Sequence, residues 1–244
     1  MMRGGNREMR RMMDKMGLDM KELQNVQQVI IKTINLLEYY STLNINNIFS
    51  NDITKSKHRS FANKEMLISQ LFKEINDQLN TKNNNNFFCK GNPDSQIMIL
   101  GSFPNDDDVK NQEILYGSRG ELLNKMLSSI SLEKEKYYLS NIYFEKDIDI
   151  RNRNNFYKDI LIKHLKIIKP KYILLLGEIV SNFFNNSKNK ILDIHGKWNS
   201  ININKDKFIT FTTFDPEILL GEPENKKLSW EDLKKFRNEI YKNL

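Results

Sequence analysis

Gln96-Ile-Met-Ile-Leu-Gly-Ser-Phe-Pro-Asn105 is the stretch that decides the fold. Four consecutive apolar residues lead into a glycine, a serine, an aromatic residue and a proline. A short apolar run bounded by turn residues is typical of a strand covered on both faces of a parallel sheet. Ligands of such sheets bind outside the carboxyl ends of the strands. We therefore predict that the loop Gly101–Asn105 borders a ligand site.

The chain beyond this stretch alternates strand and helix. Strands are predicted at Gln96–Leu100, Tyr137–Tyr143, Tyr172–Leu176 and Lys207–Thr213, and helices at Arg119–Ile130, Asn155–Ile168, Glu178–Asn185 and Ser229–Lys242. The alternation indicates an α/β fold, a three-layer sandwich with a central four-stranded parallel sheet flanked by helices. The loops that follow the four strands should then line one cleft.

Residues 1–33 differ in composition from the rest of the chain. They hold seven of the ten methionines, and their seven basic and four acidic residues give a local charge of +3. The run Met16–Thr33 resembles the N-terminus of archaeal nascent-polypeptide-associated complex proteins, which bind near the ribosomal exit. We interpret residues 1–33 as a Met/Arg-rich leader or fusion segment. The alternative that the resemblance implies is a contact with the ribosome or another partner.

Residues 34–86 are expected to form a helical extension that ends in a flexible Asn-rich connector. Helices are predicted at Ile34–Ser41 and Asn63–Leu79, with a loop at Asn44–Ser60 between them. The connector Thr81–Asn86 contains four consecutive asparagines and has no apolar side chain to bury. The α/β domain then occupies residues 87–244.

The charge of the chain favours a polyanionic partner. The formal net charge is +7 and the isoelectric point is about 9.2, and a lysine or arginine placed against a phosphate releases a counterion. The competing explanation is a coding bias toward Ile, Asn and Lys. No apolar run reaches the roughly 18–20 residues that a membrane helix needs, and the first residues lack a secretory signal. We expect a cytoplasmic monomer without a membrane partner.

Cys89 is the only cysteine among the 244 residues. One thiol can form neither an intrachain disulfide nor a cysteine-ligated zinc or iron–sulfur site within this chain. No cofactor and no metal are expected.

Seven short motifs then point to one family. They are Gln96–Asn105, Leu115–Leu123, Tyr138–Ile142, Ile168–Gly177, His195–Trp198, Phe214–Leu220 and Trp230–Leu233. In this order they resemble the motifs of the uracil-DNA glycosylase superfamily, and most closely those of its family 4. The resemblance implies a protein that binds DNA, extrudes a deaminated base and hydrolyses its N-glycosidic bond in base excision repair.

The resemblance also suggests which residues hold the base. The amide of Asn141 can offer an acceptor to N3–H of uracil and a donor to O4, which cytosine with its reversed pattern would repel. Ser102, Phe103, Tyr116 and Gly117 are the other candidates for base binding. The alternative is a purely structural role, in which Asn141 only caps a strand end and Gly117 only makes a turn.

Arg119 and Lys197 are the candidate phosphate contacts. The alternative for each is an ordinary solvent-exposed cation.

The chain differs from the family at positions that the family uses for catalysis, base stacking and iron–sulfur binding. Ser102 stands where the family has a carboxylate, Asp215 where it has a histidine, and Leu115 where it has an aromatic residue that stacks on the base. Tyr157 stands at a position of the family 4 iron–sulfur cysteines, for which Cys89 cannot compensate.

Asp106, Asp107, Asp215 and His195 are the candidate catalytic residues. The run Asp106–Asp108 could orient water, but consecutive acids after a loop also start helices. Three hypotheses follow: a DNA glycosylase with divergent catalytic residues, an inactive nucleic-acid-binding member of the superfamily, and an interaction protein that docks through residues 1–33.

Overall fold

The computed structural model describes residues 52–79, 89–145, 150–185, 187–203 and 206–243. The chain divides into two compact units, Met1–His58 and Arg59–Leu244. The predicted leader 1–33, the helix Ile34–Ser41 and the connector Thr81–Asn86 lie outside the described residues. The ribosome or partner contact through residues 1–33 therefore stays a prediction.

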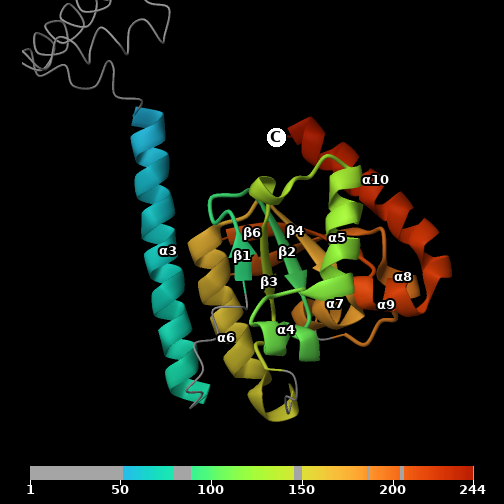
Figure 1. The fold of residues 1–244 in the computed structure, drawn as a ribbon, viewed down its shortest axis with the longest axis horizontal. Coiled ribbons are helices and arrows are strands. Elements are labelled where there is room, and N and C mark those ends of the chain that lie inside the picture. The colour runs from blue at the N-terminus through green and yellow to red at the C-terminus, as the bar shows by residue number, and fades with distance from the viewer. Residues whose placement is uncertain (1–51, 80–88, 146–149, 186, 204–205, 244) are drawn as a thin grey trace, which may run out of the picture. The chain divides into compact units, whose positions relative to one another are not determined.

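A six-stranded sheet forms the centre of the second unit, with strand order β1-β3-β2-β4-β6-β5 (Figure 1). The strands are β1 (Cys89–Gly91), β2 (Ile97–Gly101), β3 (Tyr138–Asn141), β4 (Tyr172–Leu176), β5 (Trp198–Ile203) and β6 (Asp206–Thr213). The four inner strands are parallel, as predicted, and β1 and β5 are antiparallel edges. The predicted α/β class is confirmed, but the sequence interpretation missed both edge strands. β1 has only three residues, and β5 alternates polar and apolar residues as a half-exposed strand does.

Ten helical segments accompany these strands in the described residues. They are α3 (Asp52–Leu79), α4 (Asp106–Asn111), α5 (Gly117–Ser129), η1 (Lys134–Lys136), α6 (Ile150–Ile168), α7 (Gly177–Asn185), α8 (Ile191–Ile194), α9 (Pro216–Gly221), η2 (Pro223–Asn225) and α10 (Lys226–Asn243). The predicted loop Asn44–Ser60 is wrong from Asp52 onward, because α3 begins there. Residues 52–60 contain neither glycine nor proline, so the helix extends upstream through them.

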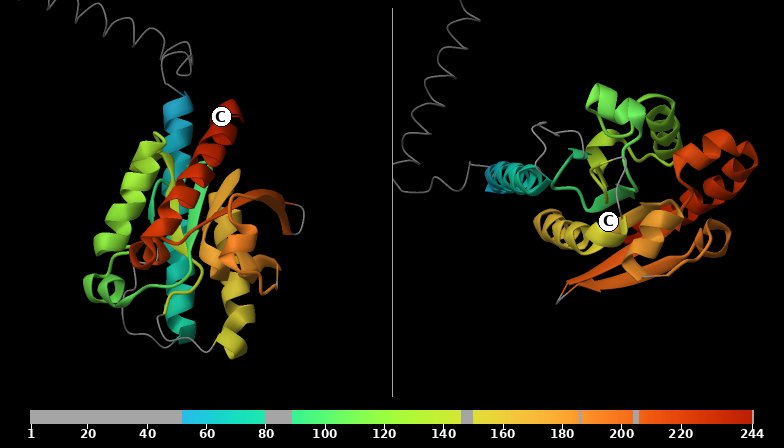
Figure 2. Two further views of the ribbon diagram at one scale, coloured as in Figure 1. Left: turned by 90° about the vertical axis from the view of Figure 1, so that its right-hand side faces the viewer. Right: turned by 90° about the horizontal axis from the view of Figure 1, so that it is seen from below.

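The sheet is covered on both faces. Side chains alternate along β2, so that Met98 and Leu100 join a core with α6 and α7, whereas Ile97 and Ile99 join a core with α5 and α10. Figure 2 shows α5 and α6 on opposite sides of the sheet. Because the four inner strands are parallel, their carboxyl ends lie at one edge of the sheet. No helix in the described residues is long and apolar enough to span a membrane.

Candidate functional site

A cleft of about 380 Å³ opens at the carboxyl edge of the sheet. Its walls come from the turns after β2, β4 and β6, as the sequence predicted for three of the four loops. The lining residues are Ser102, Phe103, Arg119, Leu176, Gly177, Glu178, Ile179, Ile191, Asp215, Glu217, Ile218 and Glu222. Three isoleucines and Phe103 make much of the wall apolar, and five charged side chains reach into it.

Ser102 and Phe103 bring the predicted loop Gly101–Asn105 into the cleft. Ser102 is buried, and its carbonyl accepts a hydrogen bond from the backbone N–H of Tyr143 at 2.9 Å. The Phe103 ring lies 6.2 Å from the Tyr143 ring. The backbone bond therefore ties the turn after β2 to the turn after β3, and the position of Ser102 is fixed by the sheet.

Asn141 ends β3 beside the same loop. Its side chain is 2% exposed, and its Oδ1 has no hydrogen-bond partner in the described part of the chain. A Cβ on Gly101 would come within 2.4 Å of this oxygen, so only glycine allows the amide to lie there. A buried acceptor without a donor costs about 1–3 kcal/mol. Asn141 is not among the residues that line the cleft, but it lies against Gly101, whose neighbour Ser102 does line it. A ligand N–H group that reached this oxygen would remove that cost.

Asp215 lines the cleft at the start of α9. Its Oδ1 accepts a hydrogen bond from the backbone N–H of Glu217 at 2.9 Å, as an N-cap side chain does. Burial raises the pKa of its carboxyl group, although the Glu217 N–H and the charge of Arg119 partly offset that effect. Gly177 adopts a φ of +88°, and its missing side chain leaves room for Asp215.

The three consecutive acids after the β2 loop separate into two environments. Asp106 and Asp107 are exposed in the first turn of α4, whereas Asp108 is fully buried. The Asp108 carboxylate accepts hydrogen bonds from Arg119 Nη2 at 2.6 Å and from the Tyr116 backbone N–H at 2.7 Å. Asp108 therefore organises the loop, and neither Asp106 nor Asp107 lines the cleft.

Arg119 connects this loop to α9. It is 5% exposed, and its Nη1 donates to Glu217 Oε2 at 2.9 Å while Nη2 holds Asp108. Its guanidinium thus already contacts two carboxylates, and the predicted phosphate contact would require Glu217 to move. Tyr116 is 41% exposed just before α5, and Gly117 begins that helix with a φ of +70°. Neither Tyr116 nor Gly117 lines the cleft.

His195 and Lys197 lie in the turn before β5. The Nδ1 of His195 is 3.0 Å from Oδ2 of Asp232, and Thr213 Oγ1 donates to that same oxygen at 3.0 Å. Lys197 is exposed, and its Nζ donates to the carbonyl of Asp193. Neither residue lines the cleft. Sequence reasoning missed Asp232, whose only signal was its place within the motif Trp230–Leu233.

Tyr157 and Cys89 do not fit an iron–sulfur cluster. The Tyr157 ring is fully buried and packs edge-on against Tyr143 at 5.0 Å, and its hydroxyl donates to Glu145 at 2.9 Å. Burial raises the pKa of the Cys89 thiol to about 11, which disfavours the thiolate that would bind iron. Among the described residues, no three His, Cys, Asp or Glu side chains are grouped so as to hold a metal.

Comparison with known proteins finds one family. The sequence model of the uracil DNA glycosylase superfamily matches residues 88–235. The type-4 uracil-DNA glycosylase of Sulfurisphaera tokodaii is 27% identical over 159 residues, which cover 61% of this chain and 71% of that protein. The type-4 uracil-DNA glycosylase of Archaeoglobus fulgidus is 26% identical over 156 residues, covering 60% and 77%. The one of Thermotoga maritima is 27% identical over 161 residues, covering 63% and 82%.

Proposed function

The chain belongs to the uracil-DNA glycosylase superfamily, and from that premise we propose that its cleft takes up a base extruded from DNA and hydrolyses the N-glycosidic bond of that base. The observation that carries the proposal is the unpartnered Oδ1 of Asn141, buried beside Gly101 at the carboxyl edge of the sheet. The substrate would be a damaged base in DNA, in particular a deaminated one. The process would be base excision repair.

Asn141 is the group proposed to read the base. An N–H of an extruded base would supply the donor that Oδ1 lacks, and Nδ2 would donate to a carbonyl of the same base. Ser102 and Phe103 line the cleft and would contact the base next to it. Tyr116 and Gly117 are proposed to border the base from the start of α5.

Asp215 is the best placed of the four candidate catalytic residues. Cleavage of an N-glycosidic bond develops positive charge on the sugar, which a nearby carboxylate stabilises. Asp215 lines the cleft, whereas Asp106 and Asp107 lie exposed on α4. His195 is held by Asp232, outside the lining of the cleft. We assign the electrostatic role to Asp215.

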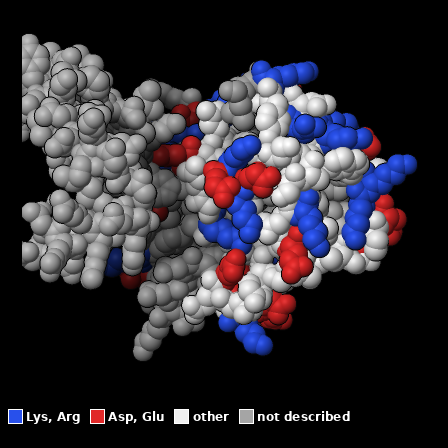
Figure 3. All heavy atoms as spheres, turned by 45° about the horizontal axis from the view of Figure 1, so that its top comes forward, with Lys and Arg blue, Asp and Glu red and all other residues white. Residues whose placement is uncertain are grey.

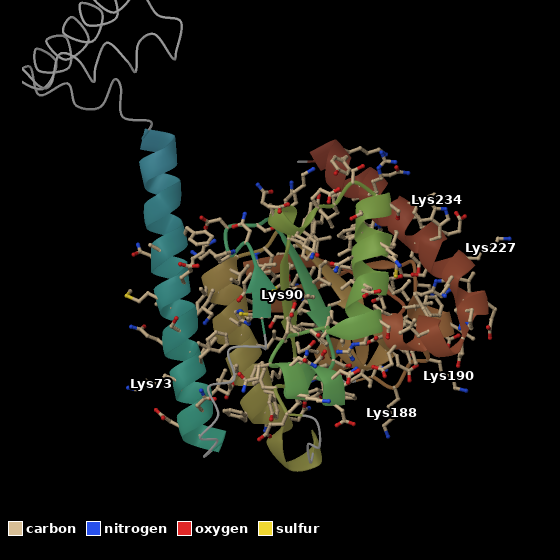
Figure 4. The ribbon with its side chains drawn as sticks, in the orientation of Figure 1. Lys73, Lys90, Lys188, Lys190, Lys227 and Lys234 are labelled. Atoms are coloured by element: carbon tan, nitrogen blue, oxygen red, sulfur yellow. The ribbon has the colours of Figure 1, made fainter. Side chains whose placement is uncertain are left out.

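Phosphate contacts are proposed at the mouth of the cleft. Lys188 and Lys190 extend into solvent from the segment between α7 and α8, just before Ile191, which lines the cleft (Figure 4). Lys197 is exposed a few residues further on. By contrast, the face turned to the viewer in Figure 3 carries basic and acidic side chains side by side. Exposed lysines near the cleft would give DNA binding a steep salt dependence.

The test is an excision assay with protein in excess over duplex and single-stranded DNA that carries uracil, hypoxanthine or xanthine. We expect abasic product from at least one of them. Replacing Asn141 by alanine should lower the rate about tenfold or more, because a hydrogen bond to the base is lost inside a buried site. Asn199→Ala on the exposed face of β5 is the matched control and should excise at the wild-type rate.

Asp215→Asn separates the electrostatic role from the structural one. Asparagine caps a helix as well as aspartate does, so α9 should keep its start. The rate should nevertheless fall by about tenfold or more, because the negative charge beside the sugar is gone. Excision at the wild-type rate would remove Asp215 from the chemistry.

A second candidate function is nucleic-acid binding without catalysis. Ser102, which cannot carry a charge, and the exposed positions of Asp106 and Asp107 favour it. DNA binding that weakens with salt, together with no abasic product from any damaged base at enzyme excess, would select this candidate. Absence of both binding and product would contradict both functions.

A further inference from the structure

The charges that line the cleft are predominantly negative. Four carboxyl groups reach it, from Glu178, Asp215, Glu217 and Glu222, against the single guanidinium of Arg119. That one cation is already matched by Asp108, whose carboxylate is fully buried 2.6 Å from Nη2. Among the described lining residues, no other cation offsets the acids.

An acidic cleft is unfavourable for the departure of uracil. Uracil leaves its sugar with a negative charge, and neighbouring carboxylates raise the free energy of that anion. Neither Ser102 nor Asp215 carries a positive charge that would oppose this effect, and the Ser102 hydroxyl can offer only a neutral hydrogen bond. The acidic lining therefore suits a base that does not become an anion when it leaves the sugar.

We propose that the base taken up by this cleft is cationic, a purine alkylated at N3 or N7. The inference rests on the proposed glycosylase function and replaces the deaminated base of that proposal with an alkylated one. Such a base carries a full positive charge while attached to the sugar and leaves as a neutral molecule. The carboxylates that oppose a uracil anion attract this base instead.

The walls of the cleft fit a flat cation. Phe103 lies in the lining and offers a ring face on which a cationic base can stack. Ile179, Ile191 and Ile218 add apolar surface to the same lining, with Ile179 40% and Ile218 43% exposed. The free Oδ1 of Asn141 would accept a hydrogen bond from an N–H of the purine.

The chemical step is a hydrolysis that needs little help for the leaving group. The oxygen of a water molecule bonds to C1′ while the bond from C1′ to the purine nitrogen breaks. The electron pair of that bond enters the ring and cancels its positive charge. The proton of the water passes to a carboxylate of the cleft and then to solvent. The loss of a carboxylate at position 102 is tolerable because the reacting bond is already weakened.

Binding of matched duplexes tests the charge directly. One duplex carries a single 7-methylguanine on a 2′-fluoro sugar, which resists cleavage, and the other carries 7-methyl-7-deazaguanine, which has the same shape without the charge. We expect the cationic duplex to bind about tenfold more tightly. Equal affinities would overturn the proposal.

Excision supplies a second readout. Release of 7-methylguanine from an ordinary duplex, measured above its spontaneous loss without protein, should be faster than release of uracil. Release of uracil but not of 7-methylguanine would overturn the cationic substrate and leave the glycosylase function standing. If no base is released and no salt-dependent DNA binding is found, the proposed function fails together with the inference.

The Glu217→Gln variant tests whether the preference for the cationic duplex depends on the charge of the lining. Glutamine can still accept a hydrogen bond from Arg119, so the loop contact is kept while one negative charge is removed. The preference for the cationic duplex should shrink by about threefold or more. Glu121→Gln on the exposed side of α5 removes the same charge away from the cleft and should leave the preference unchanged. An equal loss in both variants would show that only the overall charge matters, which contradicts the proposal.

Discussion

Replacing Asp108 by alanine should lower the free energy of unfolding by about 3–5 kcal/mol. The carboxylate is fully buried, and it is the partner of Arg119 and of the Tyr116 backbone N–H. Without it, the guanidinium stays 5% exposed with only Glu217 beside it. An unbalanced buried charge is costly because it has lost both its counterion and its water. Urea denaturation at neutral pH measures the change.

Asp107→Ala is the matched control, one residue earlier in the same helical turn. Its side chain is exposed, so only its favourable position near the start of α4 is lost, worth less than about 1 kcal/mol. The double variant Asp108→Leu with Arg119→Met removes both charges and should be more stable than Asp108→Leu alone. If Asp108→Ala and Asp107→Ala destabilise equally, the buried pair does not hold this loop.

The same pair shows why the sequence located the cleft but not the partners of Arg119. Three consecutive acids look alike in a sequence, and nothing in their order says that only Asp108 is buried. Arg119, at the start of a predicted helix, was a candidate phosphate contact, with an ordinary solvent-exposed cation as the alternative. Its two carboxylate partners lie 11 and 98 residues away along the chain, and a contact over that range leaves no local pattern.

The inner strands were predictable because they are buried on both faces. The five residues of β4 and of β2 are all buried, so their apolar runs are continuous. The edge strands gave weaker signals, since β5 is exposed on alternate residues and β1 is short. The position of the cleft followed from topology alone, because parallel strands bring their carboxyl ends to one edge.

The charge of the cleft required the structure. Glu178 follows β4, whereas Glu217 and Glu222 follow β6, and each resembles an ordinary exposed acid when taken by itself. Only the fold brings them into one lining with Asp215. Asp232 escaped notice for the same reason, as its partners His195 and Thr213 come from separate segments. Local pattern thus locates such a site, and long-range contacts decide its electrostatics.

Lowering the pH from 7 to 4 should cost the protein about 3 kcal/mol of stability through His164 alone. This side chain is 1% exposed on α6, and its Nε2 lies 2.9 Å from the Tyr138 hydroxyl. Burial lowers its pKa from 6.5 to about 4. At pH values between about 4 and 6.5, the imidazole of His164 is protonated in the unfolded chain but neutral in the folded chain. Stability is therefore fully present above about pH 6.5 and is lost as the pH falls toward 4.

Urea denaturation of the wild type and of His164→Gln at several pH values between 7.5 and 4.5 measures this contribution. Glutamine is neutral throughout and can still accept a hydrogen bond from Tyr138, so the variant should lose less stability on acidification. Carboxylates titrate in both proteins, and subtracting one curve from the other removes their contribution. The difference should grow steadily below about pH 6.5. Parallel curves would mean that His164 accepts a proton within the folded core, which would contradict its burial as a neutral partner of Tyr138.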